Sequence, residues 1–287
     1  SQERSANLVM RGDVGLTGTR YGSTSIADVS GDGNQDLLIT GFDGSGGSAT
    51  LYLGDGEGGF TEAGAGLTDI QFGSTSIADV DGDGNQDLLI TGEDGNFDSS
   101  ATLYLGNGQG GFSEAGAGLT GVREGSTSIA DVNGDGNQDL LITGGDENVD
   151  PTATLYLGNG QGGFEEADAG LTGVFRSSTS TADIDGDGNR DLVITGFDGS
   201  DLTATLYLGN GQGGFSEAGA GLTGISSGSV STGDIDGDAD SDLLITGFSN
   251  ASVSESATLY ENLFDDPLSY PEEVATDTTR SFGDAGG

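Results

Sequence analysis

The sequence contains no cysteine, no histidine, no lysine and only three prolines in 287 residues. Without cysteine the chain has no disulfides, no thiolate metal ligands and no cysteine nucleophile. Without histidine it has no imidazole base, no imidazole metal ligand and no Ser-His catalytic pair. No apolar run approaches the roughly 18 residues of a membrane-spanning helix, and the first residues have no apolar stretch of the signal-peptide type.

Basic residues are scarce, because seven arginines stand against 48 acidic residues for a formal net charge of −41. Such a surface repels phosphate backbones and anionic membranes, which excludes nucleic-acid and lipid-surface binding and favours cations as partners. Leu, Ile, Val and Phe make up about 22% of the residues, just above the level of about 20% below which highly charged chains are usually disordered. Composition alone leaves folding undecided.

A repeated segment indicates how the chain folds. The sequence at 74–79 recurs with small changes in five units, at steps of 51 or 52 residues. Within the second unit, residues 74–78, 87–91 and 101–105 are predicted strands, because they are short, rich in β-branched or apolar residues and separated by Gly-rich turns. A weaker fourth strand is predicted around 118–120. The units are anchored at Asp28, Asp79, Asp131, Asp183 and Asp234.

Four short strands in about 52 residues, repeated five times, predict an all-β fold, a five-bladed β-propeller of four-stranded blades. The last unit stops after its third strand, while the chain begins with an extra strand at 16–17. We therefore expect the N-terminal strand to complete the last blade and close the ring. An open array, or part of a larger ring, is the alternative. The propeller is expected to span 1–264 as a single domain, followed by an acidic, Ser- and Thr-rich tail or linker at 265–287.

A nine-residue turn between the first two strands of each unit is densest in acidic residues. In the second unit, positions 1, 3, 5 and 9 are Asp79, Asp81, Asp83 and Asp87. Oxygen ligands at alternate positions, with glycines that let the chain curl, suit Ca²⁺, and position 7 would add its backbone carbonyl. An EF-hand needs Glu at position 12, but isoleucine stands there in every unit. A calcium-binding hairpin turn is therefore predicted, with Mg²⁺ or a metal-free Asp-Gly turn as alternatives.

About five Ca²⁺ sites follow from this pattern, one in each unit. The predicted ligands are Asp28, Ser30, Asp32, Asn34 and Asp36 in the first unit, Asp79, Asp81, Asp83, Asn85 and Asp87 in the second, Asp131, Asn133, Asp135, Asn137 and Asp139 in the third, Asp183, Asp185, Asp187, Asn189 and Asp191 in the fourth, and Asp234, Asp236, Asp238, Asp240 and Asp242 in the fifth. At position 6 the fifth unit has Ala239 in place of glycine, so we expect strain if this position requires a positive φ.

With this turn repeated five times, residues 7–264 resemble FG-GAP and VCBS-type repeat proteins, whose best-known members are the integrin α-subunit propellers. The resemblance implies structural Ca²⁺ between the two innermost strands, an extracellular or cell-surface setting, and a role in adhesion or carbohydrate binding. The chain departs from the integrin pattern: Phe-Gly occurs at the corresponding place only at 72–73, Gly-Ala-Pro is absent, and integrin propellers have seven blades.

Loops that vary between units are better candidates for recognition than loops that repeat. The variable loops are expected on the face opposite the metal turns, where arginines and aromatic residues could bind a glycan or an acidic peptide group by stacking and bidentate hydrogen bonds. These residues are Arg20, Tyr21, Phe72, Arg123, Phe175 and Arg176. Alternatively, the aromatic rings fill blade interfaces and the arginines neutralise nearby acids.

Two other functions compete with a ligand-binding module. One is a structural spacer in a larger surface protein. The other is a glycosidase-type propeller enzyme with a carboxylate pair drawn from Glu93, Asp94, Asp146 or Asp198. Because no inner strand carries an acid beyond the metal ligand, the sequence predicts that the chain is not an enzyme. The acidic excess outside the turns, with no lysine, indicates adaptation to high salt.

Overall fold

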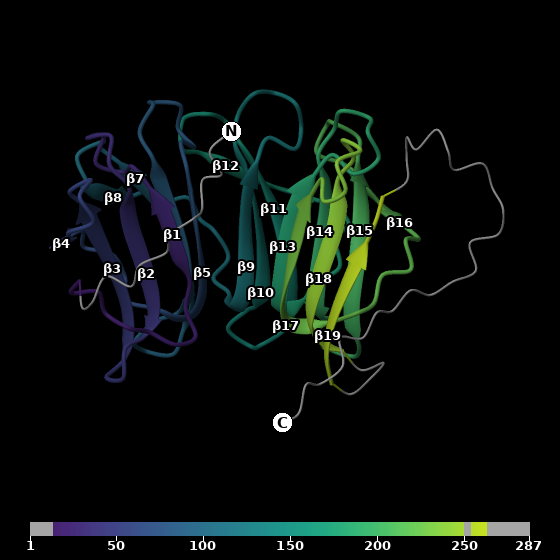
Figure 1. Ribbon diagram of the computed structural model, residues 1–287, viewed down its shortest axis with the longest axis horizontal. Coiled ribbons are helices and arrows are strands. Elements are labelled where there is room, and N and C mark those ends of the chain that lie inside the picture. The colour runs from purple at the N-terminus through teal and green to yellow at the C-terminus, as the bar shows by residue number, and fades with distance from the viewer. Residues whose placement is uncertain (1–13, 250–253, 263–287) are drawn as a thin grey trace, which may run out of the picture.

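The computed structural model describes residues 14–249 and 254–262, which form strands and turns with no helix among them. Each repeat unit folds into one antiparallel sheet whose strands lie side by side in sequence order. Figure 1 shows the first sheet at the left end of the long axis and the last sheet toward the right end. Within these residues, nothing qualifies as a helix that could cross a membrane.

The strands have the following bounds. The first sheet contains β1 (Thr24–Ala27), β2 (Asp36–Phe42), β3 (Gly47–Gly54) and β4 (Phe60–Ala63). The second contains β5 (Gln71–Ala78), β6 (Asp87–Glu93), β7 (Ser99–Gly106) and β8 (Phe112–Glu114). The third contains β9 (Arg123–Ala130), β10 (Asp139–Gly145), β11 (Pro151–Gly158) and β12 (Phe164–Ala167). The fourth contains β13 (Phe175–Ala182), β14 (Asp191–Phe197), β15 (Leu202–Gly209) and β16 (Phe215–Ala218). The last contains β17 (Ser226–Gly233), β18 (Asp242–Ser249) and β19 (Ser254–Tyr260).

The second strand of an internal sheet is buried on both faces, as its continuous apolar sequence predicts. In β6, Leu88 and Ile90 pack toward the first sheet, whereas Leu89 packs toward the third. The predicted strands at 74–78, 87–91 and 101–105 are confirmed as parts of β5, β6 and β7.

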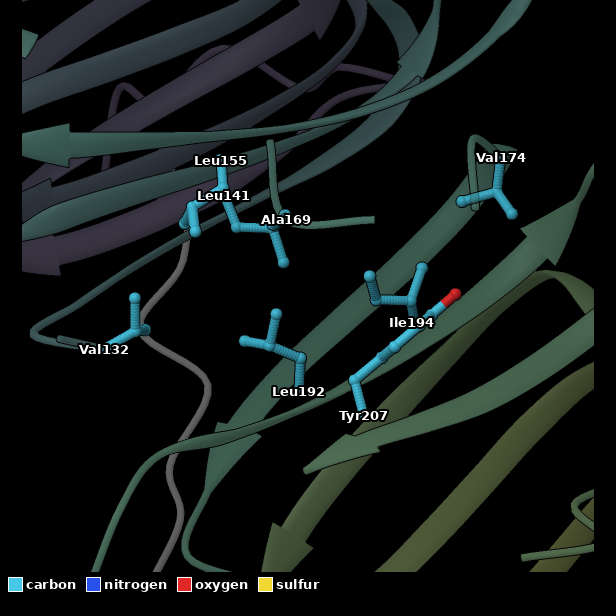
Figure 2. Packing of buried hydrophobic residues seen from close by; sticks show 8 residues of the cluster. All are labelled: Val132, Leu141, Leu155, Ala169, Val174, Leu192, Ile194 and Tyr207. Carbon is cyan, nitrogen blue, oxygen red and sulfur yellow. The ribbon is translucent and has the colours of Figure 1, made fainter. Parts of the chain in front are cut away.

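The hydrophobic core lies between consecutive sheets. Figure 2 shows the cluster between the third and fourth sheets, where Leu141 and Leu155 face Leu192 and Ile194. Three further clusters of buried hydrophobic residues join the first sheet to the second, the second to the third, and the fourth to the last. The first strands of the sheets, here called the inner strands, also contact one another in series through serine and threonine hydroxyls, with Ser25 and Thr75 oxygens 2.6 Å apart.

The stacked sheets form a propeller-like array, but ring closure is not observed. Extensive contacts join β5 to β9, β9 to β13 and β13 to β17, the short β1 has a smaller contact with β5, and β17 makes at most a marginal contact with β1. The expected tail at 265–287 lies outside the described residues.

The prediction of the fourth strand was wrong. It is the segment that starts at the phenylalanine after the Gly-rich turn, as in β12, where Phe164 pairs with Gly158. The Leu-Thr segment lies farther along, beyond a glycine with positive φ such as Gly118 (φ 66), which ends the extended backbone. Its threonine amide instead donates a hydrogen bond to the tyrosine hydroxyl of the following sheet, so that Thr120 binds Tyr156.

The expected closing strand at 16–17 is corrected for the same reason. The Thr17 amide donates to the hydroxyl of Tyr52 at 3.0 Å, which places this segment against the first sheet and not in the last one.

We predict that Tyr104→Phe lowers the free energy of unfolding by about 1–2 kcal/mol, because the amide and hydroxyl of Thr68 each lose a partner 2.9 Å away while the buried ring stays in place. Urea denaturation measures the effect. Tyr21→Phe is the control, since this side chain is 56% exposed. Equal stability of the two variants would contradict the role assigned to the hydroxyl.

Candidate metal centre

The acidic turns are folded by their own backbone hydrogen bonds. In the second sheet, the two carboxylate oxygens of Asp79 accept hydrogen bonds from the amides of Gly82 (2.7 Å) and Gly84 (2.9 Å). Both glycines have positive φ, 75° and 89°, which curls the chain around the Asp79 carboxylate. These hydrogen bonds fix the curl of the turn around the Asp79 carboxylate.

The aspartate at position 9 anchors each turn to the sheet. Asp87 is 1% exposed, and its two oxygens accept hydrogen bonds from the amides of Val80 and Gly106, both at 2.8 Å. Val80 lies in the turn and Gly106 ends β7, so one carboxylate joins three segments. The equivalent carboxylates make both bonds in every sheet; they belong to Asp36, Asp139, Asp191 and Asp242.

These buried carboxylates are electrostatically unfavourable without a cation. Burial raises the pKa of Asp87, Asp139 and Asp191, and the two backbone hydrogen bonds only partly oppose this rise. For Asp87, the carboxylates of Asp81 and Asp79 raise the pKa further. Burial thus makes the ionised form of these three carboxylates more costly than it is in water, and a bound cation would offset that cost.

Carboxylates at positions 1, 3 and 9 converge in three of the turns. Their oxygens lie within 4.8 Å of one another. The three groups are Asp79, Asp81 and Asp87, then Asp183, Asp185 and Asp191, then Asp234, Asp236 and Asp242. In the fourth sheet, Oδ1 of Asp183 is buried without a hydrogen-bond partner, and the same holds for Oγ of Ser30 at position 3 of the first turn. Hard oxygen atoms held together in this way fit Ca²⁺.

The remaining predicted ligands lie in the same turns but differ in their contacts. At position 5, Asp83 accepts a hydrogen bond from the amide of Asn85 at position 7, at 2.8 Å. The corresponding bond occurs in each of the other four turns. The first and third turns carry Ser30 and Asn133 at position 3, so they offer one carboxylate fewer. The expected positive φ at position 6 is present in every turn, including Ala239 at 82°.

The opposite ends of the inner strands carry the residues predicted to bind a ligand. Here one residue of each unit adopts a positive φ of 48–56° beside a bulge or irregularity in strand pairing. We call these five residues the bulge row; they are Tyr21, Phe72, Glu124, Arg176 and Ser227. Bulky residues seldom adopt this conformation, and none of the five positions is a glycine, so the sequence does not indicate the positive φ.

The six predicted ligand-binding residues form two clusters and one separate ion pair. The rings of Tyr21 and Phe72 stack with centroids 4.7 Å apart, and the Arg20 guanidinium lies 5.2 Å from the Tyr21 ring. Arg176 lies over the ring of Phe175 and forms an ion pair with Glu124.

Arg123 forms an ion pair at 2.5 Å with Glu93, whose side chain is 9% exposed and also accepts a hydrogen bond from Gln71. Sequence reasoning did not identify this buried Glu93 as the partner of Arg123.

The other acids considered for a catalytic pair cap their own loops. Asp94, Asp146 and Asp198 each accept a backbone hydrogen bond at 2.8 Å from the residue two positions later. Hydrogen bonds from the Asp201 and Ser200 backbone lower the pKa of Asp198.

Comparison with known proteins identifies the repeat. The family described as FG-GAP-like repeat matches residues 28–90, 79–142, 131–194 and 183–245. No curated protein matches the sequence.

Similar solved structures include a thermostable family-43 glycoside hydrolase, at 9% identity and a TM-score of 0.43 over 90% of this chain and 96% of that one. Fructan 1-exohydrolase IIa from Cichorium intybus has 14% identity and a TM-score of 0.41 over 78% of this chain and 52% of that one. β-Fructofuranosidase from Schwanniomyces occidentalis has 9% identity and a TM-score of 0.39 over the same shares.

These matches correct the prediction that the chain is not an enzyme. The three structures are of glycoside hydrolases, so the exclusion made from the sequence is withdrawn. At such identities and TM-scores, the likeness assigns no activity to this chain.

We predict that Ala239→Gly raises the free energy of unfolding by about 1 kcal/mol, because glycine relieves the positive φ of 82°. Gly188→Ala is the matched reverse change at the same position of the fourth turn, where φ is 88° and an added Cβ would meet nothing within 4 Å. It should destabilise by a similar amount in urea denaturation. If neither variant shifts the midpoint, backbone strain at position 6 is not the relevant cost.

Proposed function

Because the chain belongs to the FG-GAP-like repeat family, we propose that it is a calcium-binding repeat module, with one Ca²⁺ held by each of the five turns. The convergence of the carboxylates at positions 1, 3 and 9 carries this proposal. Positions 1, 3, 5 and 9 would supply side-chain oxygens, and position 7 a carbonyl. Ca²⁺ suits this set better than Mg²⁺, which binds fewer protein ligands and keeps more of its water.

Calcium would act on stability by removing repulsion among buried acids. Five ions add ten positive charges, which takes the formal net charge from −41 to −31. The residual charge is still large, so we propose that the protein works at high salt, where screening weakens the remaining repulsion. The absence of lysine and the acidic surface outside the turns support this part of the proposal.

We predict that Ca²⁺ at about 100 times the dissociation constant of a site raises the free energy of unfolding by about 2.7 kcal/mol for each occupied site. Thermal unfolding in EDTA, in CaCl₂ and in NaCl measures the two cation effects separately. Asp185→Asn should lower the stoichiometry or affinity seen by calorimetry, while the fold tolerates it because the third turn has Asn133 at this position. Glu217→Gln, an equal charge change on exposed β16, is the control. Equal stability in dilute EDTA and in CaCl₂ would refute the proposal.

We further propose that the bulge row is the ligand surface, and that the module binds carbohydrate in an extracellular or cell-surface setting as an adhesion protein. Two contacts support it. The stacked rings of Tyr21 and Phe72 offer the flat apolar face on which a sugar ring can pack, with Tyr21 more than half exposed. The Arg176 side chain, in the fourth unit of the row, is 54% exposed and offers bidentate donors. Strained backbone at one position of all five units is the pattern expected of a recognition site.

A glycan array, run with Ca²⁺ and with EDTA, tests the ligand surface. Tyr21→Ala and Arg176→Ala should abolish capture with little change in melting temperature, because both side chains are exposed. Arg123→Ala should instead lower the melting temperature, since it leaves the buried Glu93 without its cation. Capture unaffected by the Tyr21 and Arg176 changes would remove the bulge row as the site. If no glycan is captured, the spacer role takes its place, and a hydrolysis screen on captured glycans distinguishes binding from turnover.

A further inference from the structure

The last sheet exposes a face that every other sheet buries. The face turned toward the following sheet is formed in the second sheet by Val80, Leu89 and Leu103. At these three positions the first four sheets have apolar residues that are at most 8% exposed. In the last sheet the same positions are Ile235, Leu244 and Leu259, which are 56%, 39% and 45% exposed.

The first sheet exposes the complementary face. Ile26 on β1 is 63% exposed, whereas the equivalent Ile77 and Ile129 pack against the cores formed with the preceding sheets. The series of serine–threonine contacts between inner strands also ends at the first and last sheets.

Ser76 contacts Thr127 and Ser128 contacts Thr179, each at 2.7 Å. The next residues in this series are Ser231 of the last sheet and Thr24 of the first, and both are exposed.

We propose that the last sheet of one chain docks on the first sheet of a second copy, with the geometry of the four interfaces inside the chain. The last sheet carries the apolar residues that those interfaces bury, and the first sheet carries Ile26 at the position of Ile77, although Thr19 stands where the second sheet has the buried Ile70. The contact would pair Ser231 with the partner copy's Thr24 and cover Ile235, Leu244 and Leu259. Because the two surfaces differ, the association is head-to-tail and can extend beyond two chains.

The chain's own first sheet does not occupy the site. Figure 1 shows the first and last sheets toward opposite ends of the long axis, with the third sheet between them. Their inner strands make at most a marginal contact. Among the residues that the structure describes, this face of the last sheet is exposed, which leaves it open to a second copy.

Charge at the proposed interface makes docking depend on cations. At an internal interface, the Gly-rich turn of one sheet lies on the metal turn of the preceding sheet: the Gly110 amide donates to the Val29 carbonyl at 3.3 Å. The first sheet has Asp55 and Glu57 in this turn, where the second to fourth sheets have asparagine and glutamine. Docking would bring these two acids next to the acidic turn 234–242. Salt or a divalent cation should therefore strengthen the association.

Cross-linking tests the contact without interference, because the chain has no cysteine. Separate full-length Thr24→Cys and Ser231→Cys chains are mixed in about 1 M NaCl, where the Debye length is about 3 Å, with CaCl₂, and are then oxidised. We expect the mixed disulfide dimer to form in clear excess over either symmetric dimer. Ser231→Cys mixed with Ser113→Cys, an exposed position on β8, is the matched control and should give no such excess. In dilute buffer with EDTA the yield should fall.

Two variants distinguish a mixed dimer formed through the proposed interface from one formed by random collision. Leu244→Asp in the Ser231→Cys chain should abolish the mixed dimer, since it puts a charge at the centre of the contact. Asp55→Asn with Glu57→Gln, which copies the other units, should preserve the dimer at lower salt. A mixed dimer no more abundant than the control would overturn the proposal. So would an intrachain disulfide in the Thr24→Cys, Ser231→Cys double variant accompanied by no mixed dimer, because it would show ring closure.

Discussion

One buried carboxylate in each sheet holds the repeat together. Asp87 satisfies the amide of Val80 in the turn and the amide of Gly106 at the end of β7, and it begins the most buried strand of its sheet. No neutral side chain of that size accepts two such hydrogen bonds with two equivalent oxygens. The carboxylate is therefore required by the backbone, although burial raises its pKa. In the second, third and fourth sheets this burial is an electrostatic cost, which a cation bound at the same turn would offset.

The inner strands connect the acidic turns to the bulge row, and they also connect each sheet to the next. The bulge row lies at or shortly before the start of each inner strand, an acidic turn follows its end, and each inner strand contacts the next through hydroxyl groups such as those of Ser76 and Thr127. Phe72 lies near one end of β5, and the turn that starts at Asp79 follows the other end of this strand. The acidic turn and the bulge row therefore lie at opposite ends of the inner strand.

Most structural features that recur in every repeat unit were predicted correctly from the sequence. The three main strands of each unit follow from apolar runs such as 87–91, and the turn residues were placed correctly because Asp and Gly recur at fixed spacing. The fourth strand was misplaced because Leu119 and Thr120 look extended, while the decisive contact is made by the hydroxyl of Tyr156, 36 residues away. The bulge row could not be foreseen, since its positive φ occurs at aromatic and charged residues that usually avoid it. The Arg123–Glu93 pair joins neighbouring sheets, and single-chain patterns do not reveal such distant partners.

Departures from the repeat are concentrated in its two terminal units, and their kind is informative. The first unit has Ser30, Asp55 and Glu57, and the fifth has Val230 and Ala239, where the internal units agree closely with one another. Terminal units of repeat proteins usually replace apolar residues on the outer face by polar ones, which keeps the array soluble and prevents further stacking. Here Leu244 and Leu259 keep their apolar character on the outer face of the last sheet, and Ile26 keeps it on the first. The changes therefore alter charge and strain near the turns and, on the first sheet, place Thr19 where the second sheet has the buried Ile70, while the other apolar residues of the stacking surfaces are kept. Such a pattern is expected of ends that join under the control of cations, and it is the opposite of what a capped array requires.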